Sequence, residues 1–297
     1  MPAFRTGEDP AEARRFSVVR CGNGRDRNPA WSQAPCSWYK ICLSLSHAIF
    51  LFFAGAIGGA MNAVAGGGSF VAFPALLFTG VAPVPANATN TLSLWVGTAV
   101  SGGAYRNRLN IPRRILLPLL ITSLVGGLLG AVLLIKTPAR TFLRIIPWLI
   151  FGATLLFTFG RHLTGRISAG ISHEASNAAV AGASLFELLV AIYGGYFGGG
   201  IGIMNLAMFA ALGMTDIHAM NALKVVLVSM INGVATVTFI AAGSIVWPKA
   251  MVMIVGAACG GYSAAHYAQK LPQRLVRALV ITLGFSMTIY FFLKAYR

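Results

Sequence analysis

Residues 58–92, GGAMNAVAGGGSFVAFPALLFTGVAPVPANATNTL, decide the fold of this chain. The stretch places six glycines, three prolines and three asparagines among apolar residues that are suited to a membrane. A Gly-Gly-Gly sequence at 66–68 interrupts the first apolar run, and Pro83 and Pro85 interrupt the next one. Glycine and proline at these places predict a pair of discontinuous helices at membrane depth.

A second copy of this pattern lies 133 residues further along the chain. This offset places Gly66 on Gly199 and Gly80 on Gly213 without a gap. Interrupted hydrophobic segments at corresponding places in two halves are typical of secondary transporters, in which the breaks form the binding site. We therefore expect a site between the two glycine-rich breaks.

The composition excludes an ordinary soluble domain. The chain has 297 residues, of which 57% are hydrophobic and 10% are charged, whereas soluble domains carry roughly 25% charged residues. The net charge of +16 comes from Lys and Arg that stand between the apolar runs, where such residues meet lipid headgroups and set topology. The composition predicts a polytopic protein in a lipid bilayer, without a nucleic-acid partner.

Residues 1–40 differ in composition from the rest of the chain. They are rich in charged residues, Pro, Gly and Asn and have no apolar periodicity, which indicates a disordered basic tail. Their charged region is too long for a signal peptide. The four cysteines have no metal-ligand spacing, and the sequence carries no ATP-binding motif. We expect no metal and no cofactor, and therefore an ion or substrate gradient as the driving force.

Apolar runs divide the remainder into a first repeat at 41–160 and a second at 178–297, joined by a loop at 161–177. Each half has four runs of about 20 residues, which suffice to cross a bilayer, and one short run of about ten. The short runs lie at 69–79 and 203–212. Because five segments are an odd number, the second half would enter from the opposite side.

The predicted fold is an all-α polytopic membrane protein with two inverted repeats, about eight full spans and two short re-entrant segments. Lys and Arg in the loops divide equally between the two sides, so the positive-inside rule leaves the orientation open.

A polar stripe follows the first break. At 100° per residue, Asn90 and Thr91 fall within a narrow arc around Asn87. Polar groups inside a membrane need partners, so the stripe faces either a neighbouring helix or a hydrated cavity. The adjacent glycine break favours the cavity for Asn90 and Thr91.

Lys224 stands inside an apolar run of the second half, on the same helical arc as Asn221 and at the position that the offset aligns with Thr91. A charge at a helix centre costs about 2.5 to 3.5 kcal/mol unless it is hydrated or paired. Either the side chain extends to the membrane interface, or its ammonium binds an anionic substrate. Half-helices that begin at Ser69 and Gly202 would direct free N–H groups to the same anion.

Glu187 lies inside a predicted span. Its carboxyl group could take up a proton during a transport cycle, or it could pair with another helix, for example through Lys224. Both interpretations stay open. Asp216 directly precedes a helical run, so we expect it to be an N-cap, with His218 as an interfacial residue rather than a metal ligand.

The chain resembles the TauE/SafE family of membrane proteins, the sulfite and organosulfur anion exporters. The likeness rests on NAVAGGGSFVAFPALL at 62–77, A-x-x-T-N at 86–90, YGGYFGGGIGI at 193–203, AMNALK at 219–224 and GSIVW at 243–247. It implies a transporter with two related halves that moves a small anion such as sulfite out of the cell. The family commonly has Lys after the first T-N, where this chain has Thr91.

We therefore predict a secondary transporter that exports a small anion, sulfite or an organosulfonate, across the cytoplasmic (inner) membrane of a bacterium by alternating access. The alternatives are an integral membrane enzyme, for which the scattered histidines form no motif, and a structural or assembly subunit without its own substrate. Glu187 is the proton-coupling candidate. The substrate-binding candidates are Gly66, Gly67, Gly68, Ser69, Asn90, Thr91, Gly199, Gly200, Gly202, Asn221 and Lys224.

Overall fold

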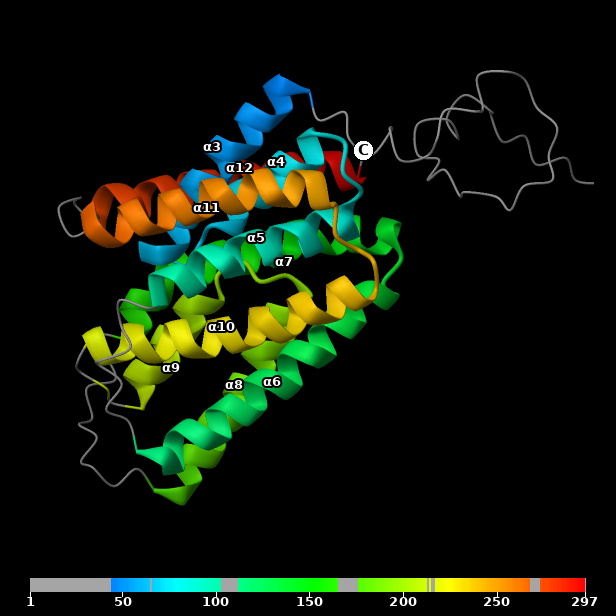
Figure 1. The fold of residues 1–297 in the computed structure, drawn as a ribbon. Coiled ribbons are helices and arrows are strands. Elements are labelled where there is room, and N and C mark those ends of the chain that lie inside the picture. Colours follow the sequence, from blue (N-terminus) through cyan, green and yellow to red (C-terminus); the bar gives the residue numbers. More distant parts are fainter. Residues whose placement is uncertain are drawn as a thin grey trace, which may run out of the picture. The chain divides into compact units, whose positions relative to one another are not determined.

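The computed structural model describes residues 44–64, 66–102, 112–164, 176–212, 214, 217–267 and 273–296. This part of the chain is helical and contains no strand (Figure 1). The predicted all-α fold is confirmed. The helices are α3 (Leu45–Val64), α4 (Ser69–Phe78), α5 (Pro83–Gly102), α6 (Arg113–Lys136), α7 (Ala139–Thr164), α8 (Asn177–Tyr196), α9 (Ile201–Ala211), α10 (Ile217–Ala241), α11 (Trp247–Tyr267) and α12 (Gln273–Tyr296).

The two short apolar runs form the short helices α4 and α9, of 10 and 11 residues. Glycines in the left-handed region separate them from the helices before them, because glycine adopts positive φ without a steric cost. Gly66 has φ 80° and its N–H bonds to the Met61 carbonyl at 3.0 Å, which ends α3. Between α8 and α9 the left-handed residues are Gly198 and Gly200, not the aligned Gly199. The two breaks therefore differ in backbone detail.

Four helices of the described part are long and apolar enough to cross a membrane. They lie at Leu45–Ala63, Arg113–Lys136, Asn177–Tyr196 and Ala219–Ala241. Helix α5 has 20 residues but is more polar, because it is an inner helix that packs on α3, α4, α10 and α11. Its polar side chains, among them Asn87 and Ser93, are fully buried against protein. The eight full spans remain a prediction.

Small residues line the contacts of α3 with α11 and of α6 with α8. A Cβ on Gly55 of α3 would lie 2.6 Å from the carbonyl oxygen of Met253. A Cβ on Gly126 of α6 would lie 2.6 Å from the Cβ of Ala191. Both distances are shorter than van der Waals contact, so only glycine permits these helices to approach so closely. Close packing through small residues is how helices associate in lipid.

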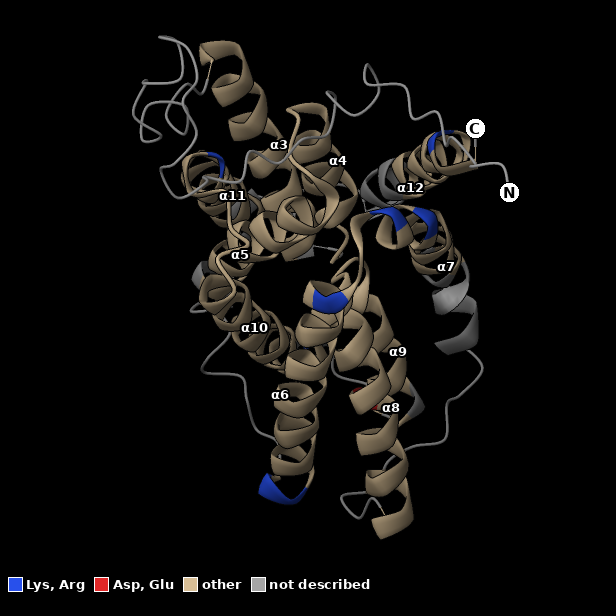
Figure 2. Ribbon diagram, turned by 90° about the vertical axis from the view of Figure 1, so that its right-hand side faces the viewer, with Lys and Arg blue, Asp and Glu red and all other residues tan. Residues whose placement is uncertain are grey.

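The helix contacts of one half have counterparts in the other when α3–α7 are aligned in order with α8–α12. The α3–α11 contact corresponds to α8–α6, α5–α11 to α10–α6, and α4–α12 to α9–α7. The contacts α5–α10 and α7–α12 each join a helix to its own counterpart (Figure 2). Such matched packing is expected of two related halves.

Most Lys and Arg of the described helices lie near helix ends (Figure 2). Arg113 and Arg114 begin α6, Lys136 ends it, and Lys294 is in the last turn of α12. Arg114 also donates a hydrogen bond to the Asn177 side chain at the start of α8. Basic residues at the ends of apolar helices suit the headgroup regions of a bilayer.

Some sequence predictions concern residues outside the described part. These are the tail at 1–40, most of the loop at 161–177, the aligned Gly213 and the N-cap role of Asp216. The side chain of His218 lies outside it as well.

Candidate functional site

The two glycine breaks lie against each other. Gly66 follows α3, and Gly202 is in the first turn of α9. A Cβ on Gly66 would lie 3.3 Å from the Cα of Gly202, and one on Gly202 would lie 3.5 Å from the Cα of Gly66. The backbones of the two halves therefore approach within contact distance at this point.

Lys224 of α10 lies at the same place. A Cβ on Gly202 would lie 3.2 Å from its Cδ, so the lysine stem rests on the start of α9. Its Nζ donates a hydrogen bond to Oδ1 of Asn221, one turn earlier on α10, at 3.0 Å. The residue is only 4% exposed, so its side chain does not extend to a membrane interface. Within the described residues it has no acidic partner.

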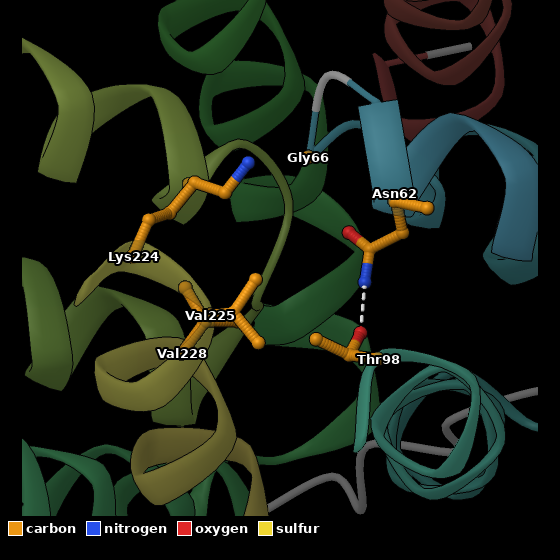
Figure 3. A pocket seen from close by; sticks show the side chains of 8 residues that line it. Asn62, Gly66, Thr98, Lys224, Val225 and Val228 are labelled. Atoms are coloured by element: carbon orange, nitrogen blue, oxygen red, sulfur yellow. Dashed lines mark hydrogen bonds between the residues drawn. The ribbon is translucent and has the colours of Figure 1, made fainter. Parts of the chain in front are cut away.

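A small cavity opens beside Lys224 (Figure 3). Its volume is about 20 Å³, enough for about one water. An anion of several atoms needs more space than the cavity has in this conformation. The cavity is lined from both halves by Asn62, Ala63, Gly66, Thr98, Gly202, Lys224, Val225 and Val228.

Asn62 and Thr98 form the wall opposite Lys224. The side-chain amino group of Asn62, on α3, donates to Oγ1 of Thr98, on α5, at 2.6 Å. The Thr98 hydroxyl in turn donates to the carbonyl oxygen of Leu94 at 2.8 Å. This chain of bonds holds the amide of Asn62 at the cavity.

Asn90 and Thr91 are buried but do not line the cavity. The Asn90 amino group donates to the Ser69 hydroxyl at 3.1 Å, which fastens α5 to the start of α4. The Thr91 hydroxyl donates to the carbonyl oxygen of Asn87 at 2.9 Å, within its own helix. The structure therefore joins Ser69 to Asn90, and none of Ser69, Asn90 and Thr91 lines the cavity.

The other predicted glycines support the breaks rather than line the cavity. The carbonyl of Gly67 accepts from the first turn of α4 at 3.1 Å, and Gly68 packs on the carbonyl oxygen of Gly58. A Cβ on Gly199 would lie 2.8 Å from a neighbouring aromatic ring. Gly200 has φ 85° and precedes α9. Gly200 needs glycine because of its positive φ, whereas Gly68 and Gly199 leave no room for a Cβ beside their neighbours.

Glu187 lies apart from the cavity lining, at the contact of α8 with α6. It is fully buried, and the Ser123 hydroxyl donates to its Oε1 at 2.6 Å. Its Oε2 has no hydrogen-bond partner. No ion pair joins it to Lys224 in the described part of the chain. Its observed pairing with another helix is through Ser123.

Sequence reasoning missed Asn62 and Thr98 as lining residues. Two signals were available for them. Asn62 stands four residues before the Gly-Gly-Gly break, and Thr98 falls on the polar stripe of α5. The apolar lining residues Val225 and Val228 carry no such signal, because valines in an apolar helix are ordinary lipid-facing or core residues.

The cavity combines one ammonium group with neutral hydrogen-bonding groups and an apolar wall. Among the described residues, no three His, Cys, Asp or Glu side chains gather to hold a metal ion. The arrangement is suited to holding an oxyanion through Lys224, and it presents no pair of acid and base groups for catalysis.

Comparison with known protein families matches residues 51–291 to the family described as sulfite exporter TauE/SafE. The chain belongs to this family. Family membership makes it an integral membrane protein of a transporter family. A probable membrane transporter protein of Haemophilus influenzae is 31% identical over 244 residues, which cover 80% of this chain and 91% of that protein.

Two further family relatives have similar names. The probable membrane transporter protein ORF9 of Sinorhizobium sp is 26% identical over 240 residues, covering 81% of this chain and 90% of that protein. The probable membrane transporter protein YfcA of Escherichia coli K12 is 25% identical over 244 residues, covering 80% and 87%. No solved structure matches the chain.

Proposed function

We propose that this protein is a secondary transporter that exports a small anion, sulfite or an organosulfonate, across the cytoplasmic membrane of a bacterium. The observation that carries the proposal is Lys224, a buried ammonium group beside the meeting point of two glycine breaks. A charged group without a counter-charge is costly inside a membrane. An anion in the adjacent cavity supplies that counter-charge, and the family description names an anion of this kind.

The site offers hydrogen-bond donors for such an anion. An ammonium group has three N–H bonds, of which Lys224 uses one for Asn221. The first N–H groups of a helix have no acceptor within it and lie at the positive end of its dipole. In α9 the N–H of Ile203 bonds back to Gly200, and Gly202, one residue earlier in the same first turn, lines the cavity. Lys224 and Gly202 can therefore hold two oxygens of one oxyanion.

Alternating access follows from the proposed inverted repeats. Helices α3–α7 and α8–α12 give five segments each, and their contacts correspond pairwise. The proposed site stands between the two halves, so rocking of one half against the other would open it to either side in turn. The cavity is small in this conformation, and the proposed rocking would also widen it.

Glu187 is the proposed proton carrier. It does not line the cavity, and among the described residues its only hydrogen-bond donor is the Ser123 hydroxyl and its second oxygen has no partner. A carboxyl group in this setting can exchange a proton without changing partners. It stands in the middle of α8, the helix that leads into the break before α9, so a movement of α8 on protonation would reach the half-helix at the site.

Efflux from proteoliposomes tests the proposed function. Liposomes containing the purified protein are loaded with sulfite, thiosulfate, sulfoacetate or a simple carboxylate, and efflux is followed with and without a proton gradient. We expect sulfite or the sulfonate to leave faster than the carboxylate, and faster with the gradient. Efflux equal to that of protein-free liposomes for every anion would contradict the proposal.

A further inference from the structure

We infer that Asn62 sets the ligand preference of the cavity, favouring an anion that carries its own O–H or N–H group over an anion of equal size that carries none. The inference rests on the proposed anion site and concerns the wall opposite Lys224. Figure 3 shows Asn62 and Lys224 on opposite sides of the pocket, with Thr98 beside Asn62.

Thr98 fixes the orientation of the Asn62 amide. A hydroxyl group has one hydrogen to donate, and that of Thr98 goes to the carbonyl oxygen of Leu94 at 2.8 Å. Thr98 can therefore only accept in its 2.6 Å contact with Asn62. The group of Asn62 that faces Thr98 must be the amino group, since hydrogen-bond accounting of this kind assigns the two ends of an amide.

The carbonyl oxygen of Asn62 is thereby directed to the cavity. Figure 3 shows this oxygen on the side that faces Lys224. No hydrogen bond to it comes from the part of the chain that the structure describes, since the Lys224 ammonium donates to Asn221 instead. If the amide turned round, its carbonyl oxygen would face the lone pairs of the Thr98 oxygen, so the bond to Thr98 would be lost unless Thr98 gave up its bond to Leu94.

The cavity thus has a donor end at Lys224 and an acceptor end at Asn62, with Val225 and Val228 as apolar walls. A bound oxyanion would accept hydrogen bonds from the Lys224 ammonium. The other end of the ligand then lies near the Asn62 carbonyl oxygen. A further oxygen without a hydrogen is repelled there, whereas an O–H or N–H group donates a hydrogen bond to it. A site built to accept a hydrogen bond rejects a ligand that lacks the donor, because its own acceptor is left unpaired.

Two sulfonates of nearly equal size and charge test this preference. The probes are 2-hydroxyethanesulfonate, which carries an O–H group, and 1-propanesulfonate, which has a methyl group in its place. Initial transport rates are measured in proteoliposomes at equal, low concentrations. The native protein should prefer the hydroxylated anion about three- to tenfold, the worth of one net hydrogen bond.

Variants identify the group responsible. Asn62→Leu keeps the size of the side chain and should bring the ratio of the two rates to about one. Thr98→Val frees the amide to turn its amino group to the cavity, so it should lower the ratio with Asn62 still present. Thr122→Val is the matched control, because its hydroxyl bonds to the Pro118 carbonyl on α6 and does not line the cavity. It should keep the native ratio.

A ratio does not depend on expression level or on the folded fraction. A native ratio of about one, or a ratio unchanged in both Asn62→Leu and Thr98→Val, overturns the inference. Transport of sulfite with neither sulfonate moved overturns it while leaving anion transport intact. Transport of no anion by the native protein overturns the proposed function and this inference together.

Discussion

The substitution Gly202→Ala probes the point where the two halves meet. The added methyl carbon would lie 3.5 Å from the Cα of Gly66, which is ordinary contact, and 3.2 Å from the Cδ of Lys224. Optimal carbon–carbon contacts are about 3.5–4.0 Å, so the lysine stem must move by a few tenths of an ångström. A lysine stem is flexible, and we expect the free energy of unfolding to change by less than about 1 kcal/mol.

Gly202→Ala should lower the rate of sulfite efflux far more than it lowers the free energy of unfolding. The methyl group takes up space in a cavity of about 20 Å³ and displaces the ammonium that would hold the anion. We expect a loss in sulfite efflux of about tenfold, equivalent to about 1.4 kcal/mol. The assay pairs efflux from proteoliposomes with thermal unfolding of the purified protein. Gly182→Ala is the control, because a Cβ there meets nothing within 4 Å.

Efflux and thermal unfolding test two different parts of this reasoning. Native efflux from a Gly202→Ala protein of native stability would refute the placement of the transport path between the breaks. A large loss of stability would refute the claim that only the lysine stem resists the methyl group.

Three further predictions concern packing and coupling. In Gly55→Ala the added Cβ would lie 2.6–3.2 Å from the Met253 backbone. The substitution should lower the free energy of unfolding by about 0.5–2 kcal/mol, which is the cost of overpacking less the gain in helix propensity. In the control Gly152→Ala the Cβ meets open space, so the unfolding temperature should not fall. Gly66→Ala forces a side chain into φ 80° and should lower the free energy of unfolding by about 1–2 kcal/mol; unchanged thermal unfolding would speak against this backbone geometry. Glu187→Gln keeps an oxygen for its hydrogen bond but cannot titrate, so efflux should persist and lose its response to an imposed proton gradient; a native response would exclude Glu187 as the proton carrier.

Helix breaks could be predicted from the sequence because they follow from single residue types. The Gly-Gly-Gly sequences at 66–68 and 198–200, each followed by a short apolar run, need no knowledge of neighbours to indicate interrupted helices. The burial of Lys224 beside the second break did not follow from the sequence, which also allowed its side chain to extend to the membrane interface. The backbone conformations that glycine permits depend on the residue itself and not on its tertiary contacts, so the breaks can be predicted without knowledge of the fold.

The partners of the polar side chains could not be predicted in the same way. Ser123 and Glu187 are 64 residues apart, and Asn62 and Thr98 are 36 apart, so each pair depends on how distant helices pack. The helical arc of Thr91 made it a candidate for the cavity, yet it is not among the residues that line the cavity. The position of a residue on a helical arc gives the direction of its side chain but not which residues it faces.

Binding of sulfite to the purified protein tests the role of Lys224 most directly. Lys224→Met retains the apolar stem and removes the charge, and Lys136→Met at the exposed end of α6 is the control for loss of a lysine. Removing a buried charged group from an ion pair costs about 2–5 kcal/mol. The affinity for sulfite should therefore fall at least about 30-fold in Lys224→Met and remain native in Lys136→Met. Equal sulfite affinity in the native protein and a folded Lys224→Met variant would contradict the proposed anion site.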